Sequence, residues 1–542
     1  MQLHADMLFL GGPIYTADPH GPRWVEAVAV GGGRIMAIGR AEDLVELQGP
    51  RTEVVNLAGR LLLPGFTESH IHFVELALRA VQIDVTSAAS AGEVAAAVRD
   101  RVAAGSAAGH GAELWIRGGG WNANTWVDGV APHRRVLDAV APQLPVVLDS
   151  KELHGVWANS VALRRAGIDA STPDVPGGVI ERDEDGEPTG ILRENAVELV
   201  TRVMPRPGLA ETTAAVRQAI PSMWQAGIVA IHNANDSGDG LSFQTYQALQ
   251  QAGDLRLRVL QHIPSGNLPH ARALGLRSGF GDAWLRIGGV KMFADGALGS
   301  RTANMLQPYE GDPGNWGVAA TDPEEMLEQA MLASQAGLSL TIHAIGDRAN
   351  RDVLNILAEV RAAEGDRRLR HRIEHVQCIH DDDLPRLAQL GIIGSVQPIH
   401  ATSDIEIVDR YWGAGRARGA YAFRRLLDSG ARLVFGSDGP IEPHDPRIGI
   451  HAAVTRTRAG GSPGPEGWQP QERLTVAEAV DAYTYWPAYA AGEEGYRGCI
   501  RAGHVADLVV LSEDIFSIEP QRILDTDIDL TVLDGGVVWR RS

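Results

Sequence analysis

The sequence predicts an α/β protein: a TIM-like (β/α)8 barrel, a small β-sandwich domain built from both chain termini, and a large insertion after the first barrel strand. Two observations predict this architecture. The middle of the chain repeats a strand-then-helix rhythm eight times, whereas both ends consist of short β-like runs separated by glycine turns. A length of 542 residues is too long for one simple core and suits a large barrel with a second domain.

The predicted barrel strands are apolar runs that are each followed by a helical pattern. Examples are "GIVAIHN", "LRIGGVKMF", "LSLTIHA" and "ARLVFGSD". Alternating strands and helices are typical of parallel α/β folds, and near-continuous apolar strands fit a sheet that is covered on both faces. The eight runs begin near residues 61, 228, 257, 286, 338, 372, 392 and 432.

The same patterns predict the domain boundaries. Residues 1–60 and 497–542 would form the composite β-sandwich, because neither end has enough strands to bury a face alone. Residues 61–496 would form the barrel. Residues from about 80 to 220 break the rhythm with extra apolar runs and the polar stretch "PGGVIERDEDGEPTG", so we expect an insertion there, close to the barrel mouth.

Composition and charge exclude several classes of protein. The formal net charge of −19 argues against a nucleic-acid partner, because phosphate backbones are bound by an excess of Lys and Arg. Two cysteines exclude a disulfide framework and fit a reducing compartment. The N-terminus is a poor signal peptide, and no run of about 18 apolar residues could cross a membrane. We therefore expect a cytoplasmic protein that binds a small molecule and no membrane, with a homodimer as the default assembly.

Candidate metal ligands stand where the predicted strands end. His70 and His72 follow the first strand, and residues i and i+2 of a strand share a face, so both imidazoles can reach one point. The carboxyl ends of barrel strands converge on the active site in such folds. The set at these ends is His70, His72, Lys291, His343, His375 and Asp438. Imidazole and carboxylate suit zinc above all, and also manganese, iron or nickel.

Lys291 is the unusual member of this set, because a bound cation would repel its ammonium group. Burial and nearby positive charge lower the pKa of a lysine, and a neutral amine can add carbon dioxide to become a carbamate. We then expect one or two divalent ions with an N6-carboxylated Lys291 as the bridging ligand. The ligands would be His70, His72 and Asp438 for one ion, and His343 and His375 for the other.

These ligands predict metal-dependent hydrolysis. A water molecule whose pKa is lowered by the ions would attack a carbonyl carbon. Asp438 could accept the proton of this water and pass it to the leaving nitrogen, so it would combine the roles of ligand and general base.

The ligands and their chain order resemble the metal-dependent amidohydrolase superfamily. The motifs "PGFTESHIH", "KMFADGALGSRTA", "HAIGDRA", "RIEHVQ", "SVQPIH" and "GSDGP" resemble amidohydrolase family 3, the branch that contains N-substituted formamide deformylases. This resemblance covers essentially the whole chain and implies a hydrolase of an amide, N-acyl or N-formyl bond. Members often carry Asp in "PGFxDxH", whereas this chain has Glu68, whose longer side chain would alter hydrogen bonding around the ligands.

Several of these residues also have a structural interpretation. Lys291 could be a structural lysine paired with Asp295 or Asp438, Asp438 could cap a helix, and the two later histidines could be core residues. Glu374 is expected to face away from the metal, because neighbouring strand residues point in opposite directions.

Weaker candidates come from the loops and would line the substrate pocket. His154 and His400 could donate a hydrogen bond to an oxyanion, and Arg301 could bind a carboxylate with two hydrogen bonds. Trp121 and Tyr309 could supply apolar walls. Each of the five could instead have only a packing or ion-pair role.

Two other functions stay open from the sequence. The same metal frame could cleave an ester or a phosphoester, and a protein that keeps the fold could be a non-catalytic binding or regulatory protein. The complete ligand set favours an enzyme. The sequence does not identify its substrate.

Overall fold

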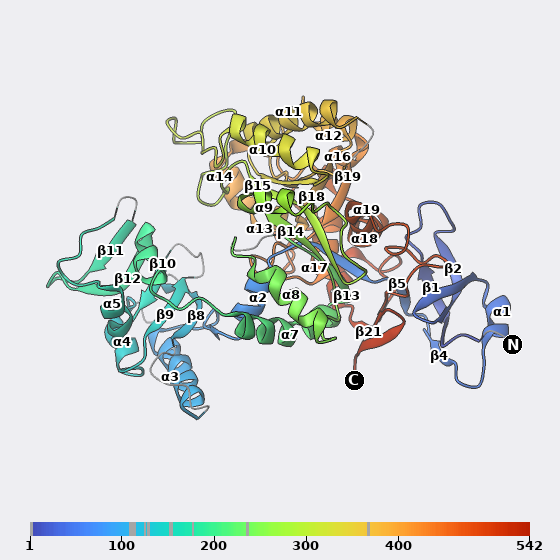
Figure 1. Cartoon of the computed structure of the whole chain (residues 1–542), viewed down its shortest axis with the longest axis horizontal. Helices are drawn as coiled ribbons and strands as arrows, with labels where there is room; N and C mark the ends of the chain where they lie inside the picture. The colour runs from blue at the N-terminus through green and yellow to red at the C-terminus, as the bar shows by residue number, and fades with distance from the viewer. Residues whose placement is uncertain are drawn as a thin grey trace. The chain divides into compact units, whose positions relative to one another are not determined.

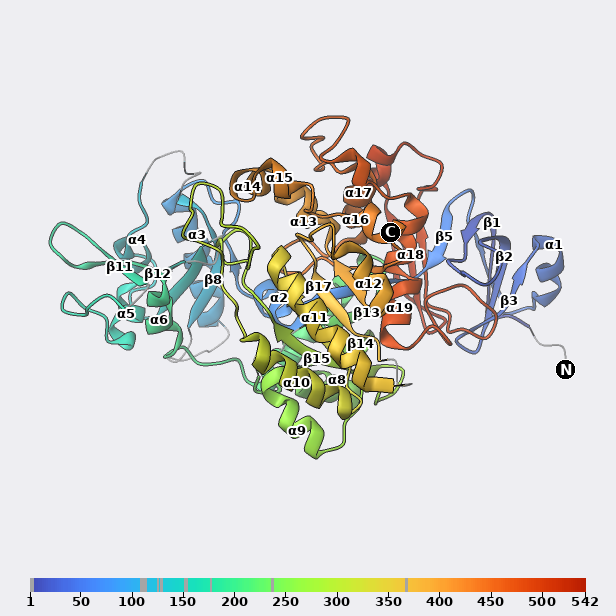
Figure 2. The same ribbon diagram turned by 90° about the horizontal axis from the view of Figure 1, so that it is seen from above.

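The computed structural model describes residues 4–107, 115–123, 126, 130–150, 155–175, 178–234, 238–365 and 369–542 (Figures 1 and 2). The chain divides into two compact units. One comprises Met1–Phe73 and Arg217–Ser542, and the other comprises Val74–Val216. The larger unit contains two sheets, and the smaller unit contains a third.

The first sheet of the larger unit is an eight-stranded parallel barrel, as the sequence predicts. Its strands pair in chain order, and main-chain hydrogen bonds complete the closure between its first and last strands. The amide of Asp438 donates to the carbonyl of His70 at 2.8 Å, and the amide of His72 donates to the carbonyl of Gly439 at 2.8 Å. The strands are β6 (Phe66–Ile71), β13 (Ile228–Asn233), β14 (Arg258–Pro264), β15 (Leu285–Phe293), β16 (Leu340–Ala344), β17 (Arg372–His375), β18 (Ile393–Val396) and β19 (Arg432–Phe435).

The first barrel strand begins later than the sequence indicates. Leu61–Pro64 form a separate strand, β5, which pairs with β20 (Leu508–Leu511) in the terminal sheet. Gly65 separates β5 from β6, and a Cβ atom there would lie only 2.6 Å from the side chain of Val229. Only glycine permits this close approach, so the apolar run contains a break between two sheets.

Helices surround the barrel strands (Figures 1 and 2). α11 (Asp347–Glu364) shows why they pack there, because its buried residues recur every three or four positions and form one apolar face. Within the described ranges, none of the helices is long and apolar enough to cross a bilayer. The other helices are α7 (Leu209–Gln225), α8 (Leu241–Gln251), α9 (Leu268–Ala273), α10 (Pro323–Gln335), α12 (Leu384–Leu390), α13 (Pro398–Ser403), α14 (Ile405–Tyr411), α15 (Gly413–Ala417), α16 (Phe423–Asp428), α17 (Pro446–Thr455), α18 (Val476–Tyr483) and α19 (Tyr485–Ala491).

Both chain termini contribute strands to the second sheet of this unit. The sheet runs in the order β22-β21-β20-β5-β1-β2-β3, and β4 pairs with β1. These strands form one continuous hydrogen-bonded sheet. A β-sandwich consists of two sheets that pack face to face, so the predicted sandwich stays a prediction. Besides β5 and β20, its elements are β1 (Met7–Tyr15), β2 (Trp24–Gly31), β3 (Arg34–Gly39), the short helix α1 (Ala41–Leu44), β4 (Glu53–Asn56), β21 (Ile528–Leu533) and β22 (Gly536–Arg540).

The smaller unit, 74–216, has its own six-stranded sheet and its own apolar core. The sheet order is β11-β12-β10-β9-β8-β7, and buried tryptophans such as Trp157 lie in the core. The predicted insertion at about 80 to 220 overlaps this unit, and its place near the barrel mouth stays a prediction. The elements are α2 (Phe73–Ala80), β7 (Ile83–Asp84), α3 (Ala91–Ala107), β8 (Ile116–Trp121), α4 (Arg134–Asp138), β9 (Val146–Ser150), β10 (Gly155–Ala158), α5 (Ser160–Ala166), β11 (Gly178–Arg182), β12 (Pro188–Glu194) and α6 (Glu198–Thr201).

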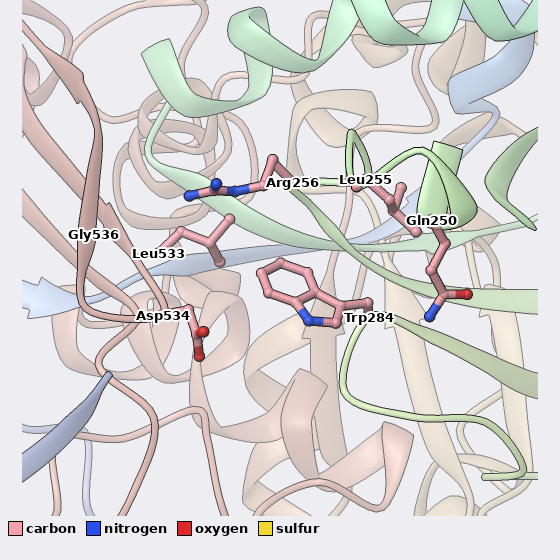
Figure 3. A pocket seen from close by; sticks show the side chains of 8 residues that line it. Gln250, Leu255, Arg256, Trp284, Leu533, Asp534 and Gly536 are labelled. Atoms are coloured by element: carbon pink, nitrogen blue, oxygen red, sulfur yellow. The ribbon is translucent and has the colours of Figure 1, made fainter. Parts of the chain in front are cut away.

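A buried ion pair joins the barrel to the terminal sheet. Arg258, the first residue of β14, donates from Nε to Oδ2 of Asp507 at 2.6 Å and from Nη2 to Oδ1 at 3.0 Å. The two side chains are 3% and 5% exposed. Figure 3 shows a pocket of about 300 Å³ at the same junction, where Trp284 and Arg256 lie between the starts of barrel strands and the β21–β22 turn. This pocket is at the amino ends of the strands and therefore opposite the predicted metal site.

Substitution of Asp507 by asparagine is expected to lower the free energy of unfolding by about 3–5 kcal/mol, because the buried Arg258 loses its buried counter-charge and keeps only the half-exposed Asp534, 3.3 Å away. Denaturant unfolding followed by circular dichroism measures the change. Asp254→Asn is the matched control, since Asp254 and Arg217 form an ion pair whose side chains are 44% and 48% exposed, and such surface pairs contribute about 0–1 kcal/mol. Equal midpoints for the two variants would contradict the prediction.

Candidate functional site

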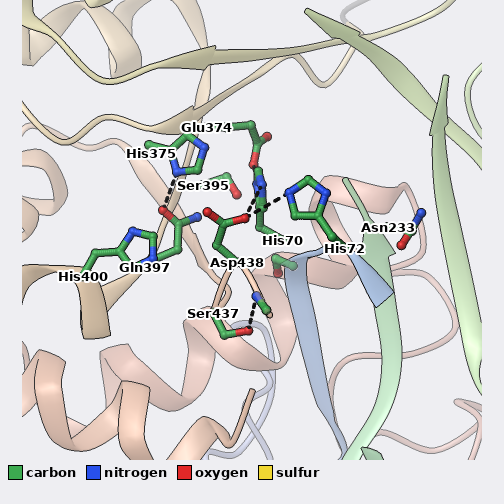
Figure 4. A network of polar contacts seen from close by, with 12 residues as sticks. His70, His72, Asn233, Glu374, His375, Ser395, Gln397, His400, Ser437 and Asp438 are labelled. Atoms are coloured by element: carbon green, nitrogen blue, oxygen red, sulfur yellow. Dashed lines mark hydrogen bonds and ion pairs between the residues drawn. The ribbon is translucent and has the colours of Figure 1, made fainter. Parts of the chain in front are cut away.

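The strand ends bring two of the predicted ligands to one carboxylate (Figure 4). Nε2 of His72 lies 3.1 Å from Oδ1 of Asp438, and Nε2 of His70 lies 3.4 Å from the same oxygen. His70 is in β6, and Asp438 follows β19, so barrel closure places them side by side. Two imidazoles that are two residues apart thus reach one point.

The remaining ligand candidates lie next to this pair. The ring of His375 is 4.8 Å from that of His70 and 4.5 Å from that of His343, measured between centroids. The ring of Phe293 is 5.3 Å from His343, and Nζ of Lys291 is 4.9 Å from the centre of the Phe293 ring. His375 therefore lies next to His70 and His343 next to His375, and Lys291 lies behind Phe293, whereas His343 is not among the described side chains whose donor atoms are close enough to share one ion.

Two of these residues have strained backbones. Asp438 has a φ of 61° and His375 has a φ of 77°, in the left-handed region that residues other than glycine seldom adopt. Such conformations persist only where the surrounding structure holds them, and they concentrate at functional sites. The amide of Asp438 is held by the carbonyl of His70 at 2.8 Å.

Three of the histidines have one ring nitrogen hydrogen-bonded to an oxygen of the protein, which leaves the other nitrogen for a ligand. This is the usual arrangement of metal-binding histidines, because the second nitrogen fixes the ring and its tautomer. The pairs are Nδ1 of His70 with Oε2 of Glu374, Nδ1 of His375 with Oε1 of Gln397 at 2.9 Å, and Nε2 of His343 with the carbonyl of Gly296 at 3.0 Å.

The atoms that face one another in the site lack hydrogen-bond partners among the described residues. Nε2 of His70 and Oδ1 of Asp438 are both buried and make no hydrogen bond. Burying such groups unpaired costs about 1–3 kcal/mol each. A divalent cation between them would satisfy both atoms, so the residues present fit a metal ion.

Burial and neighbouring charge set the protonation of this group. Burial would raise the pKa of Asp438, but the nearby imidazoles of His70 and His72 outweigh burial and hold that pKa well below its usual range. Burial, helped by Lys291, lowers the pKa of His343 to about 4. A carboxylate and a neutral imidazole are the forms that bind metal ions.

Lys291 is buried, and burial lowers its pKa to about 8. The carboxylates that could have paired with it have other partners. Asp438 contacts His72, and Asp295 lies 3.5 Å from Nε2 of His343 and accepts amide hydrogen bonds from Ile345 and Gly346. The site therefore contains a buried amine, part of which is uncharged near pH 7 to 8.

Glu68 joins the two sides of the barrel closure. Its Oε1 accepts hydrogen bonds from the amide of His70 at 3.0 Å and from the amide of Ser437 at 2.9 Å. Burial raises its pKa to about 7, against these hydrogen bonds. The longer side chain therefore supports the backbone of both His70 and the turn that carries Asp438.

His400 is the candidate substrate residue that the structure places beside the ligands. Its ring lies parallel to that of His375, with centroids 6.4 Å apart, and its Nδ1 contacts Nε2 of Gln377 at 3.2 Å. Among the residues that the structure describes, two groups of side chains have nitrogen and oxygen atoms close enough to hold an ion: His70, His72 and Asp438, and His375, His400 and Asp438. Asp438 belongs to both groups.

Three other substrate candidates have structural contacts. Arg301 forms an ion pair with Asp312 at 3.3 Å, and the buried hydroxyl of Tyr309 donates to the carbonyl of Ala303 at 2.9 Å. Trp121 is buried in the smaller unit, where Nε1 donates to the carbonyl of Leu148 at 2.8 Å. His154 lies outside the described residues. A substrate role for these four residues stays a prediction.

Sequence reasoning missed the role of Glu374. The sequence predicts that Glu374 faces away from the metal. In the structure its carboxylate contacts one of the candidate ligands, His70, and also the guanidinium of Arg372. The left-handed backbone at His375 breaks the alternation on which the expectation rested. An arginine two residues before a glutamate, on one face of a buried strand, was the available signal.

A closed parallel barrel with histidines and an aspartate gathered at its strand ends defines a metal-dependent hydrolase. A family model described as "Amidohydrolase family" (Amidohydro_3) matches residues 53–539. The chain therefore belongs to the amidohydrolase family and is a hydrolytic enzyme that acts on carbon–nitrogen bonds.

Known proteins similar to the chain agree with this membership. A putative amidohydrolase, YtcJ, of Bacillus subtilis is 34% identical over 98% of this chain and 99% of its own. An N-substituted formamide deformylase of Arthrobacter pascens is 28% identical over 99% of both chains. A crystal structure of an uncharacterized metal-dependent hydrolase from Pyrococcus horikoshii matches 95% of this chain and 99% of its own, with 28% identity and a TM-score of 0.78.

Proposed function

We propose that this enzyme hydrolyses an amide-type bond, of the amide, N-acyl or N-formyl kind, in a small molecule, with divalent metal ions and Asp438 as the general base. One observation carries the proposal: Nε2 of His70 and Nε2 of His72 converge on Oδ1 of Asp438, where two of these buried atoms lack hydrogen bonds. The deformylase relative supports the choice of bond.

We assign the metal ligands as follows. One ion would be held by His70, His72 and Asp438, and a second by His343 and His375, with N6-carboxylated Lys291 shared between them. Nitrogen and carboxylate donors favour zinc, and manganese, iron or nickel would also fit. An ion bound there would supply Lewis-acid polarisation of the substrate carbonyl and would lower the pKa of a water molecule.

Side chains of the protein would transfer the proton and stabilise the oxyanion. The Asp438 carboxylate, which its low pKa keeps ionised, accepts the proton of the attacking water and delivers it to the leaving nitrogen from its central place. His400 would donate from Nε2 to the oxyanion, because Nε2 is buried and makes no hydrogen bond with the described residues. Gln377 holds the other nitrogen of this ring.

Removal of the metal by a chelator is expected to abolish turnover, and addition of zinc or manganese should restore it, because in this proposal the ion activates the water and polarises the carbonyl. Purified protein is dialysed against chelator, its metal content is measured, and activity is then titrated with each ion. A buffer-dialysed sample of unchanged metal content is the control. Unaltered activity in the metal-free protein would exclude this function and would favour a non-metal reaction.

A substrate comparison then tests the bond. The metal-loaded enzyme is assayed with N-acyl amino acids, N-substituted formamides, carboxylic esters and phosphoesters under one set of conditions. The proposal expects the amide-type compounds to have the highest kcat/KM. A preference for esters or phosphoesters would replace the bond assignment, and a metal-binding protein without turnover on any class would favour a binding or regulatory role.

A further inference from the structure

Arg372 lies at the centre of a buried polar network behind the metal ligands. Its guanidinium donates to the carbonyl of Ser69 at 2.6 Å and to Oγ of Ser395 at 2.8 Å, and Nη1 lies 3.0 Å from Nδ1 of His232. These partners come from β6, β18 and β13, so Arg372 in β17 links four barrel strands. The side chain is 3% exposed, and water therefore does not compete for these hydrogen bonds.

The same guanidinium holds Glu374. Nε of Arg372 contacts Oε1 of Glu374, and Nη2 donates to Oε2 at 2.8 Å. The carboxylate is thus a fixed, fully buried acceptor.

Glu374 presents this carboxylate to His70. Oε2 contacts Nδ1 of His70, whose opposite nitrogen, Nε2, lies 3.4 Å from Asp438 (Figure 4). An ionised carboxylate can only accept hydrogen bonds, so Nδ1 must carry the proton. In the neutral imidazole Nε2 then has a lone pair, and this lone pair faces the position where an ion would bind.

We propose that Glu374 is a positioning residue that holds His70 in its Nδ1–H tautomer, and that Arg372 holds Glu374 in turn, so that Nε2 of His70 is ready to bind a divalent ion. This inference rests on the proposed function, because it concerns the affinity of the same site for metal. The carboxylate also increases the basicity of the imidazole, which strengthens its bond to a cation.

A purely structural role is the competing explanation, since any buried charge network stabilises a barrel. The chain contains a matched cluster that separates the two explanations. Oε1 of Glu364 contacts Nε2 of His371 at 2.6 Å, and Oε2 of Glu364 accepts from Nη1 of Arg361 at 2.6 Å. The histidine and the glutamate of this cluster are buried and Arg361 is 17% exposed, but the histidine lies immediately before β17 and is not among the candidate ligands.

The experiment measures the metal affinity of the apoprotein, with zinc titrated against a chromophoric chelator. Wild type, Glu374→Ala, Glu374→Gln and the control Glu364→Gln are compared in the full chain. We expect Glu374→Ala to bind zinc about 10–100-fold more weakly. Glu374→Gln should give a smaller loss, because the amide oxygen can still accept from Nδ1. Glu364→Gln should bind as wild type does, although its unfolding midpoint falls.

The outcomes are distinct. Unchanged zinc affinity in the Glu374 variants, or an equal loss in Glu364→Gln, would overturn the positioning role while leaving the proposed function intact. If the wild-type protein itself binds neither zinc nor manganese, iron or nickel, the proposed function fails before the positioning role is tested. Should Glu374→Ala not fold, Glu374→Gln decides: a weakened affinity in a folded Glu374→Gln protein supports the proposal, and wild-type affinity contradicts it.

Discussion

Replacing Asp438 with asparagine is expected to reduce kcat/KM by about 10³-fold or more, because the variant loses the proton acceptor of the reaction. Asparagine has nearly the same size, so the turn at this residue should remain, including the main-chain hydrogen bond to the carbonyl of His70. Activity is measured in a metal-replete assay, and circular dichroism and thermal unfolding report the fold.

Two further variants sharpen this test. His72→Asn removes an imidazole that contacts the same oxygen, and it should lose activity to a similar extent. Asp347→Asn is the matched control, since Asp347 is a buried carboxylate that accepts from the amide of Leu306 at 2.7 Å and has no assigned role in catalysis. Full activity in Asp438→Asn would remove both of the roles assigned to this residue.

Lys291→Ala is expected to lose activity that a short-chain carboxylic acid with bicarbonate partly restores. Loss of a metal ligand should cost several kcal/mol of transition-state stabilisation, which corresponds to roughly 10²-fold or more in rate. Carboxylation requires the neutral amine, and the reaction R–NH2 + CO2 → R–NHCOO⁻ + H⁺ releases one proton. Burial lowers the pKa of Lys291 to about 8, which increases the neutral fraction near pH 7.

The rescue separates two roles for the lysine. A small acid that enters the space left by the side chain can supply the missing carboxylate oxygens, so activity should rise with acid concentration in Lys291→Ala. The same acid should not rescue His72→Asn, in which the missing group is an imidazole. A Lys291→Ala protein that stays inactive at every acid concentration would favour an unmodified lysine at this position.

Much of the barrel and its strand ends could be predicted, because these features depend on patterns within single segments. Each apolar run carries its own strand signal, and the polar residue that follows it marks the end of the strand. The prediction failed at Leu61–Pro64, where one continuous apolar run serves two sheets. The break at Gly65 depends on a side chain 164 positions away, Val229, and no local pattern reports that contact.

The surroundings of the candidate site could not be predicted to the same degree. Arg301 and Tyr309 have plausible chemistry for a pocket, yet their polar groups are engaged by Asp312 and by the carbonyl of Ala303. His400 lies beside His375 because α13 follows β18, next to β17 in the barrel. These contacts depend on which loops lie side by side in the folded chain. The number of residues between two loops in the sequence does not show whether they are neighbours.

The sequence by itself determined the candidate metal ligands, their order along the chain and their place at strand ends, because the two-residue repeat of a strand and the parallel direction of the barrel require little beyond local geometry. Only the tertiary structure decided which atoms face an ion and which are already bound. Those choices depend on register and closure across strands: Glu374 reaches His70 from a segment 304 residues later, and Asp438 meets both imidazoles only where the barrel closes.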